Sequence, residues 1–439
     1  MGFRISRTAQ HYFTRRAAWN WLAVAVLGMA LLTGCASTTS ASQTPVSDPA
    51  PQNVTLVLWH GWSGPARQAL SSLVDEFNRQ HPSGRVFAQS MPLTSMPNDL
   101  RAAATAGSGP HLALIPNTWI GGLARDQVIV PLDDLVSKEQ QQAMLPATLG
   151  GAQATDAAGK SHLYGMPVSF DTLALFYNRA NVDAPQNTAT MLQIARGLSE
   201  PSATPPRWGL ALNLSVDTTM GYLYAFGGRV FDEQGKPVIG SSGRAGTEQW
   251  LAWLKTLHTD PQLMAHPDGS LEQERSLKNG NVFMTFGWAH ELADYHRLWD
   301  TNMGVAPLPT LSETNAAPQP YVQSDVLVIN SRVSDAERKV AVAFLQFMTS
   351  KDTQAKLLAS YVQPACRAVP LDGDTPDMAA ARAFRAAAEH GQPMPNTPTR
   401  DAVQQVLRIM QRQVLAGNAT PADAVSDAQT RLQALVGQP

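Results

Sequence analysis

The amino-acid sequence predicts an α/β protein of two lobes joined by crossing segments, with a ligand cleft between the lobes. Strands and helices alternate along the chain: the apolar run 54–59 (VTLVLW) precedes a Gly-rich turn, and apolar residues then keep helical spacing over 65–81. Residues 164–182 pass from a Gly-Met-Pro turn into an apolar run, 173–177, which is typical of a covered strand. The length of 439 residues allows two or three domains, each with its own core.

The segment 164–182 (YGMPVSFDTLALFYNRANV) is predicted to be the crossing between the lobes. Its Gly and Pro punctuate the chain, so we expect the first lobe to end at Pro167 and the second to be built from Leu173. Asp171 and Tyr177 would then lie near the cleft.

The other elements follow the same alternation. In the first lobe we expect a strand at 86–91, a helix at 98–106 and a strand at 111–115. In the second lobe we expect a strand at 208–212, a helix at 218–225, an apolar helical stripe over 250–257 and a strand within 280–288. Residues 318–324 should return to the first lobe, followed by a strand at 326–329, a helix opened by the capping box of Ser334 and Glu337, a short helix from Asp352, and helices at 401–415 and 420–436.

The charge balance bears on the class of partner. Lys and Arg number 33 and Asp and Glu 35, a net charge of −2, and there is no polybasic run. A basic patch is the electrostatic footprint of proteins that bind nucleic acid, so no nucleic acid is expected as a partner.

The first 34 residues read as an export leader. Four arginines, the last of them Arg16, precede the apolar run 21–32, which meets Leu-Thr-Gly-Cys35. This pattern predicts a signal peptide ending in a lipobox-like cleavage site; the rule for such leaders implies a lipid on Cys35. An ordinary signal peptide with a chance cysteine is the alternative, and the export route, Sec or twin-arginine, stays open. Residues 35–53, rich in Ser, Thr and Pro, are expected to form a flexible tether.

Several stretches resemble one family in the correct order along the chain. Besides 164–182, these are Phe226-Gly227-Gly228-Arg229-Val230-Phe231-Asp232, the strand and loop 280–288 ending in Trp288, and 304–309 (GVAPLP). They resemble the extracellular solute-binding proteins of family 1, the maltose-binding-protein-like receptors of ABC importers.

The resemblance implies a periplasmic-binding-protein-like fold of type II. One lobe would comprise 54–168 plus 323–368, and the other 169–322 plus 369–439. It further implies hinge closure on a carbohydrate, delivery to ABC permease subunits, a monomer, and a location on the extracytoplasmic face of the membrane, in the periplasm or at the cell surface.

The candidate ligand-binding residues are aromatic and small polar residues near strand ends, where open α/β sheets bind ligands. An aromatic ring covers the C–H face of a sugar, and polar side chains bond its hydroxyl edge. The expected rings are Trp59, Trp62, Trp119, Tyr177, Trp288 and Tyr321; the polar groups are His60, Asn117, Asp171, Arg229 and His290; and Gly227 and Gly228 allow close backbone approach. Each has a structural alternative: Trp59 as core, Asp171 as a hinge hydrogen bond, Tyr177 as packing under the cleft.

Catalytic motifs are missing from the sequence. Ala154 stands where a phosphate-binding loop before Lys160 needs glycine, and Asp294, four residues after His290, breaks a zinc motif. We therefore expect no enzyme activity, no cofactor and no metal. Arg229 keeps open a glycerol-phosphodiester or another anionic sugar derivative as ligand. Asp171, Glu291 and Asp294 keep open a secreted glycoside hydrolase, which requires a fixed separation between two carboxylates. A lipoprotein with an adhesive or scaffolding role is the third class.

Overall fold

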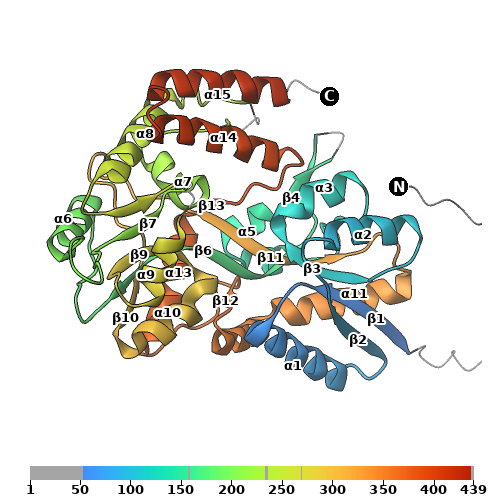
Figure 1. The fold of residues 1–439 in the computed structure, drawn as a ribbon. Coiled ribbons are helices and arrows are strands. Elements are labelled where there is room, and N and C mark those ends of the chain that lie inside the picture. The colour runs from blue at the N-terminus through green and yellow to red at the C-terminus, as the bar shows by residue number, and fades with distance from the viewer. Residues whose placement is uncertain (1–52, 157–158, 233–235, 268, 437–439) are drawn as a thin grey trace, which may run out of the picture. The chain divides into compact units, whose positions relative to one another are not determined.

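The computed structural model describes residues 53–156, 159–232, 236–267 and 269–436 (Figure 1). The predicted leader, Cys35 and all of the tether except Asn53 lie outside this range. Within it, no helix combines the length and the apolar character needed to span a bilayer.

The first βαβ unit follows the predicted pattern. Strand β1 (Val54–His60) pairs in parallel with β2 (Gly84–Ser90) and β3 (Leu112–Pro116). Helix α1 (Gly64–Gln80) carries Leu70, Leu73, Val74 and Phe77 on its buried face, at the i, i+3, i+4, i+7 spacing of an amphipathic helix. The predictions for 54–59, 65–81, 86–91 and 111–115 are confirmed to within a few residues at their ends.

Within the described ranges, the strands form one eleven-stranded mixed sheet and a separate two-stranded sheet. The main path runs β2-β1-β3-β11-β6-β9-β7-β8, while β10 and β12 pair with β6, and β13 pairs with β11. The remaining strands are β4 (Gln153–Thr155), β5 (Ser161–Leu163), β6 (Met166–Asn178), β7 (Ala211–Asn213), β8 (Met264–His266), β9 (Met284–Trp288), β10 (Met303–Ala306), β11 (Tyr321–Ile329), β12 (Gln363–Pro364) and β13 (Gln392–Pro393).

Helices cover the sheet and follow most strands. They are α2 (Met96–Thr105), η1 (Asn117–Trp119), α3 (Ile120–Arg125), α4 (Lys138–Gln142), α5 (Pro146–Gly151), α6 (Thr188–Leu198), α7 (Val216–Ala225), α8 (Arg244–Thr259), α9 (Leu271–Lys278), η2 (Ala289–Glu291), α10 (Leu292–Trp299), η3 (Asp300–Asn302), α11 (Asp335–Thr349), α12 (Lys351–Ala355), η4 (Lys356–Ser360), α13 (Pro376–His390), α14 (Arg400–Leu415) and α15 (Pro421–Val436). In Figure 1, α14 and α15 lie side by side and pack against α8.

The crossing is one continuous strand. β6 spans 13 residues; Met166–Thr172 pair with β11, and Leu173–Tyr177 pair with β9. Most of its side chains are buried, as expected for a strand covered on both faces. The chain therefore passes from Pro167 to Leu173, the two predicted boundaries, without leaving the sheet.

Among the residues that the structure describes, buried apolar side chains form two large clusters and two smaller ones. The first gathers residues of 56–168 and 326–371 together with Ala381, and the second gathers residues of 173–321 and 394–432. In the third, the Phe176 ring stacks on Tyr295, with centroids 4.1 Å apart, and lies 5.8 Å from Phe384 of α13.

Several elements differ from the predictions or were not predicted. Strand β7 begins at Ala211, and Trp208 makes only an isolated bridge to Val282. Strand β11 begins at Tyr321, because the returning segment already pairs with β6. Helix α13 was not predicted, and neither were α6, α9 and α10.

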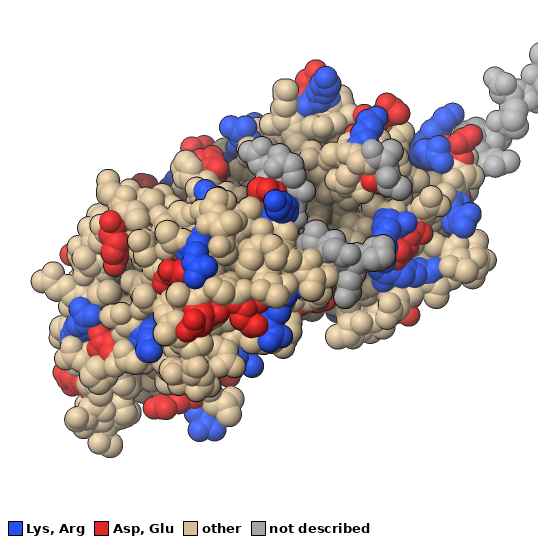
Figure 2. Space-filling view, turned by 90° about the horizontal axis from the view of Figure 1, so that it is seen from above, with Lys and Arg blue, Asp and Glu red and all other residues tan. Residues whose placement is uncertain are grey.

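The charged side chains on the face shown in Figure 2 are interspersed. Over the part of this face that the structure describes, Lys and Arg alternate with Asp and Glu among uncharged residues, so it presents no basic stripe of the kind that binds nucleic acid.

Candidate functional site

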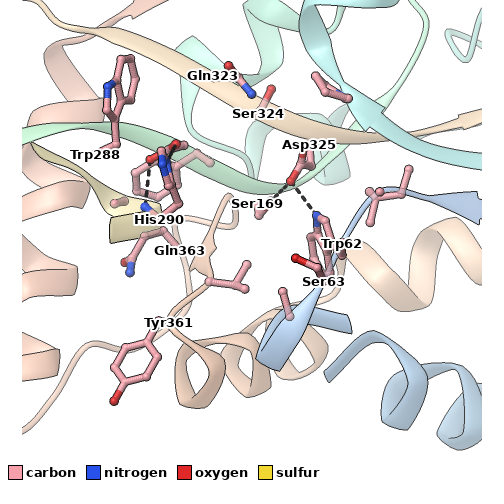
Figure 3. A pocket seen from close by; sticks show the side chains of 18 of the residues that line it. Trp62, Ser63, Ser169, Trp288, His290, Gln323, Ser324, Asp325, Tyr361 and Gln363 are labelled. Atoms are coloured by element: carbon pink, nitrogen blue, oxygen red, sulfur yellow. Dashed lines mark hydrogen bonds and ion pairs between the residues drawn. The ribbon is translucent and has the colours of Figure 1, made fainter. Parts of the chain in front are cut away.

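A cavity of about 640 Å³, the main cavity, lies where strands β6 and β11 meet the loops after β1 and β9 (Figure 3). Its wall also includes the segment between η4 and β12. The lining residues are Gly61, Trp62, Ser63, Pro65, Ala66, Leu93, Leu114, Pro116, Ser169, Phe170, Asp171, Asp217, Trp288, Ala289, His290, Ala293, Gln323, Ser324, Asp325, Ser360, Tyr361, Val362, Gln363, Met394 and Arg400.

The turn between β1 and α1 presents Trp62. Gly61 makes this turn fit, because a Cβ there would lie 2.2 Å from Cδ2 of Leu93. The indole Nε1–H of Trp62 donates to Oδ2 of Asp325, at 2.7 Å. The Trp62 ring therefore stands at the cavity wall with its polar atom already bonded.

Asp325 accepts two hydrogen bonds. Besides Trp62, the hydroxyl of Ser169 donates to the same oxygen, at 3.2 Å. Burial raises the pKa of the Asp325 carboxyl, and the bonds from Trp62 and Ser169 oppose that rise.

The loop after β9 presents Trp288 and His290. Trp288 ends the strand, and its backbone N–H donates to Oε2 of Glu291 at 2.7 Å, which fixes the start of η2. Burial raises the pKa of Glu291. His290 Nδ1 lies 2.6 Å from Oδ2 of Asp171, and the His290 backbone N–H donates to the other oxygen of that carboxylate at 3.3 Å. The hydrogen bond to Asp171 raises the pKa of His290, while burial opposes the rise.

The model of the family described as bacterial extracellular solute-binding protein matches residues 72–386. The chain belongs to this family. The predicted resemblance is therefore confirmed at the level of the family.

Relatives and solved structures agree with this membership. The maltotriose-binding protein of Pyrococcus abyssi is 23% identical over 353 residues, covering 79% of this chain and 74% of that protein. The galactooligosaccharide-binding protein of Bacillus subtilis is 22% identical over 382 residues, covering 85% and 87%.

Among solved structures, the maltose/maltodextrin-binding domain from Bdellovibrio bacteriovorus bound to maltotriose has a TM-score of 0.68 at 23% identity, covering 87% of this chain and 100% of that one. The Thermus thermophilus maltotriose binding protein has a TM-score of 0.69 at 21% identity, with coverage of 87% and 100%. The predicted fold class, a two-lobed α/β binding-protein fold, is confirmed.

Four of the predicted site residues line the main cavity of this solute-binding protein: Trp62, Asp171, Trp288 and His290. Trp119 lines a separate cavity of about 170 Å³ together with Arg101 and Arg400, and Arg400 also lines the main cavity.

Asn117, His60, Tyr321 and Trp59 lie outside the main cavity because they are used in packing. The Asn117 side chain is fully buried: its amide donates to the Met394 carbonyl at 2.9 Å, and its oxygen accepts the Ser324 N–H at 3.0 Å. His60 is 3% exposed, and burial lowers its pKa. Tyr321 packs into the second cluster and Trp59 against the first.

The remaining predicted residues also lie away from the cavity. The Tyr177 ring covers Gly304: a Cβ added to Gly304 would lie 2.3 Å from Cζ of Tyr177. Gly227 adopts φ +81° in the turn after α7, and Gly228 follows it. The Arg229 guanidinium lies 5.3 Å from the centroid of the Tyr224 ring and donates to the Gly228 carbonyl at 2.7 Å.

The cavity contains polar residues that the sequence did not single out. Gln323 lies opposite Asp171 in the β6–β11 pairing, and Gln363 opposite Phe170 in the β6–β12 pairing. Tyr361 has a left-handed backbone, φ +60°. The place of Gln323 in the returning segment 318–324 was a usable signal, whereas no local pattern marks Tyr361.

Glu291 and Asp294, which were considered as possible glycosidase carboxylates, do not line the main cavity. Glu291 turns to the Trp288 backbone, and Asp294, 72% exposed, pairs with Arg297 at 3.1 Å. Among the residues that the structure describes, no group of three or more His, Cys, Asp or Glu side chains could hold a metal ion.

Proposed function

We propose that this protein is the extracytoplasmic receptor of an ABC importer and that it captures a carbohydrate in the main cavity by closure of its lobes. The observation that carries the proposal is the pair of indoles, Trp62 and Trp288, at one cavity with hydrogen-bonding side chains between them. The rings supply apolar faces for sugar C–H groups, and the Asp171–His290 pair with the glutamines supplies partners for hydroxyls.

The relatives support an oligosaccharide as the ligand. Their names specify maltotriose and galactooligosaccharides, and the similar structures hold maltotriose. The cavity volume of about 640 Å³ falls within the usual range for small-molecule sites, about 300–1,000 Å³.

We also propose the predicted division into lobes, 54–168 plus 323–368 and 169–322 plus 369–439. The two large apolar clusters support it, since they draw on nearly the same ranges. The crossing strands β6 and β11 would then be the hinge about which ligand binding closes the lobes. A ligand that contacts both lobes favours the closed form by differential affinity.

The predicted export leader and the family support an extracytoplasmic location. The finer proposal is a monomer held to the membrane by a lipid on Cys35, facing the periplasm or the cell surface and delivering sugar to ABC permease subunits. Mass spectrometry of the membrane fraction would find an acylated Cys35 at the mature N-terminus; an unmodified soluble chain would contradict the anchor.

Two rivals remain in the test. Arg229, the reason to consider an anionic ligand, donates a hydrogen bond to the neighbouring Gly228 carbonyl, but Arg400 lines the cavity, so glycerol phosphates are included in the panel. A hydrolase would cleave its sugar.

The test uses purified residues 52–439 and a panel of mono-, di- and oligosaccharides with glycerol phosphates. A ligand bound only by the native state at a hundredfold excess over Kd stabilises it by about 2.7 kcal/mol. We expect the melting temperature to rise with one sugar class, and the sugar to be recovered intact by chromatography. A flat panel would remove sugars as the ligand, a shift with glycerol phosphates alone would favour the anionic class, and a cleaved sugar would favour the hydrolase.

A further inference from the structure

Three side chains from three separate parts of the chain meet at one edge of the cavity (Figure 3). Trp62 comes from the turn after β1, Ser169 from β6 and Asp325 from β11, and the indole Nε1–H and the serine hydroxyl donate to the same Asp325 oxygen at 2.7 and 3.2 Å. The crossing strands are thus bonded directly to an aromatic side chain of the cavity wall.

The pairing of the crossing strands explains how Asp325 reaches this point. Asp325 pairs with Ser169, but Val326 pairs with Pro167, so the register shifts between them. Proline has no N–H to donate to a ladder and is tolerated at such bulges. Residues directly opposite each other in an antiparallel pair share a face, which puts the Ser169 and Asp325 side chains together on the cavity side.

The hydrogen bond determines what Trp62 offers to a ligand. Indole has a single donor and no acceptor, so once Nε1–H is bonded to Asp325 only the ring face remains for contact. A bond to a carboxylate is shorter and stronger than one between neutral groups. The ring is therefore held in one orientation before a ligand arrives, which reduces the entropy cost of binding.

Apolar residues continue this surface. Pro65 and Ala66 line the cavity beside Trp62, and Leu93, whose side chain covers Gly61, is 45% exposed. The crossing strands β6 and β11, by contrast, contribute polar lining residues, among them Asp171 on β6 and Gln323 on β11.

We propose that Asp325 is a positioning residue: its hydrogen bond holds the Trp62 indole ring in one orientation and links the ring to strand β11. Asp325 then acts on the ligand through Trp62, whose indole ring contacts the ligand with its apolar face only. The effect on affinity rests on the proposed carbohydrate-binding function, whereas the fixed indole is a property of the ligand-free protein.

The first test therefore needs no ligand. Residues 52–439 carrying ¹⁵N-labelled tryptophan show one indole N–H signal per tryptophan, and the Trp62 signal is identified by its loss in Trp62→Phe. We expect slow hydrogen exchange in the parent protein and exchange at least tenfold faster in Asp325→Ala. Asp325→Asn, which keeps an acceptor oxygen and nearly the same shape, should fall between them. Ser169→Ala is the matched control, because it removes the other donor and leaves the indole bond. Equal exchange in the parent and both Asp325 variants would overturn the proposal.

The second test uses whichever sugar the panel identifies. If Asp325 acts through Trp62, Asp325→Asn weakens binding about fivefold or more in the parent protein but hardly changes it in the Trp62→Phe background, which lacks the indole N–H. Effects that multiply instead would mean that Asp325 contacts the ligand directly, contrary to the proposal. Circular dichroism of each variant verifies folding. If the panel is flat, the exchange measurement still decides whether Asp325 fixes Trp62, so failure of the carbohydrate proposal is distinguished from failure of this one.

Discussion

His290 Nδ1 lies 2.6 Å from Oδ2 of Asp171, which joins the loop after β9 to the crossing strand β6. The same carboxylate also accepts the backbone N–H of His290 at 3.3 Å. With Nδ1 directed to Asp171, the other ring nitrogen, Nε2, is left for a ligand in the cavity. That nitrogen donates a hydrogen bond when the ring is protonated and accepts one when the ring is neutral.

Ligand affinity should therefore depend on pH through His290. The bond to Asp171 raises the pKa of His290, and Glu291 and Asp294 act in the same direction, so the ring stays protonated to higher pH than an ordinary histidine. The His290–Asp171 ion pair is fully present below about pH 6.5, the ordinary pKa of histidine, and is lost as pH rises through the raised pKa of His290. We expect calorimetric affinity for the sugar to fall over that upper range, and to fall at lower pH in Asp171→Asn.

The control for this prediction is His290→Gln, which keeps a polar side chain but does not titrate. Its affinity should be flat between pH 5.5 and 9. The His290 side chain is 68% exposed, so stability changes little with its titration, and binding is the measurement to follow. A parent protein whose affinity is also flat would contradict the role of His290.

Trp288 is the second predicted aromatic ring of the main cavity. Replacing it with alanine removes a stacking ring from the cavity, and we expect sugar affinity to fall roughly 10- to 100-fold, equivalent to about 1.4–2.8 kcal/mol. Trp288→Phe keeps a smaller ring and should lose less. Trp119→Ala is the matched control, since Trp119 lines the smaller cavity. Calorimetry on the three variants would refute the prediction if Trp288→Ala bound sugar as tightly as the parent.

Helix α11 offers a test of stability away from the cavity. The Ser334 hydroxyl accepts the Glu337 N–H at 3.4 Å, and Glu337 Oε2 accepts the Ser334 N–H at 2.7 Å, which is the capping box predicted from the sequence. We expect Ser334→Ala to lower the free energy of unfolding by about 1 kcal/mol in denaturant titration. Sugar affinity should not change, and a changed affinity would show that α11 is coupled to the site.

The sequence predicted features that depend on neighbouring residues. The apolar run of β1 and the spacing of α1 identify themselves locally, as does the cap of α11. Trp62 and Trp288 were predicted for the cavity because each lies at or just beyond a strand end, and both do line it. A residue in the same kind of position can instead have a structural role. Asn117 also follows a strand, yet its side-chain amide forms hydrogen bonds with backbone groups of distant segments and does not line the cavity.

What the sequence did not predict depends on long-range pairing. Trp62 and Asp325 are 263 residues apart, so their bond requires the return of β11 beside β6. Gln363 reaches the cavity because the two residues of β12 pair with β6. Helix α13 was not predicted because its buried face is largely alanine, which is a weaker helical pattern than a stripe of larger side chains. These alanines are Ala380, Ala381, Ala383, Ala387 and Ala388.

Gly287 tests the packing beneath Trp288. It pairs with Ala174 of β6, and a Cβ there would lie 2.8 Å from the Phe176 ring and 3.1 Å from Cε2 of Tyr295. Both rings are held in the third cluster and have little room to move. We expect Gly287→Ala to lower the free energy of unfolding by about 1–3 kcal/mol through overpacking, and to weaken sugar binding because Trp288 is the next residue.

Gly197, in helix α6, is the matched control. A Cβ there meets no atom within 4 Å, and alanine in a helix is favoured over glycine by roughly 0.5–1 kcal/mol. Gly197→Ala should therefore melt at or slightly above the parent temperature and bind sugar equally well. If Gly287→Ala also melted at or above the parent temperature, the contact between β9 and the Phe176 ring would not constrain this position, and the strand beneath Trp288 would have room to shift.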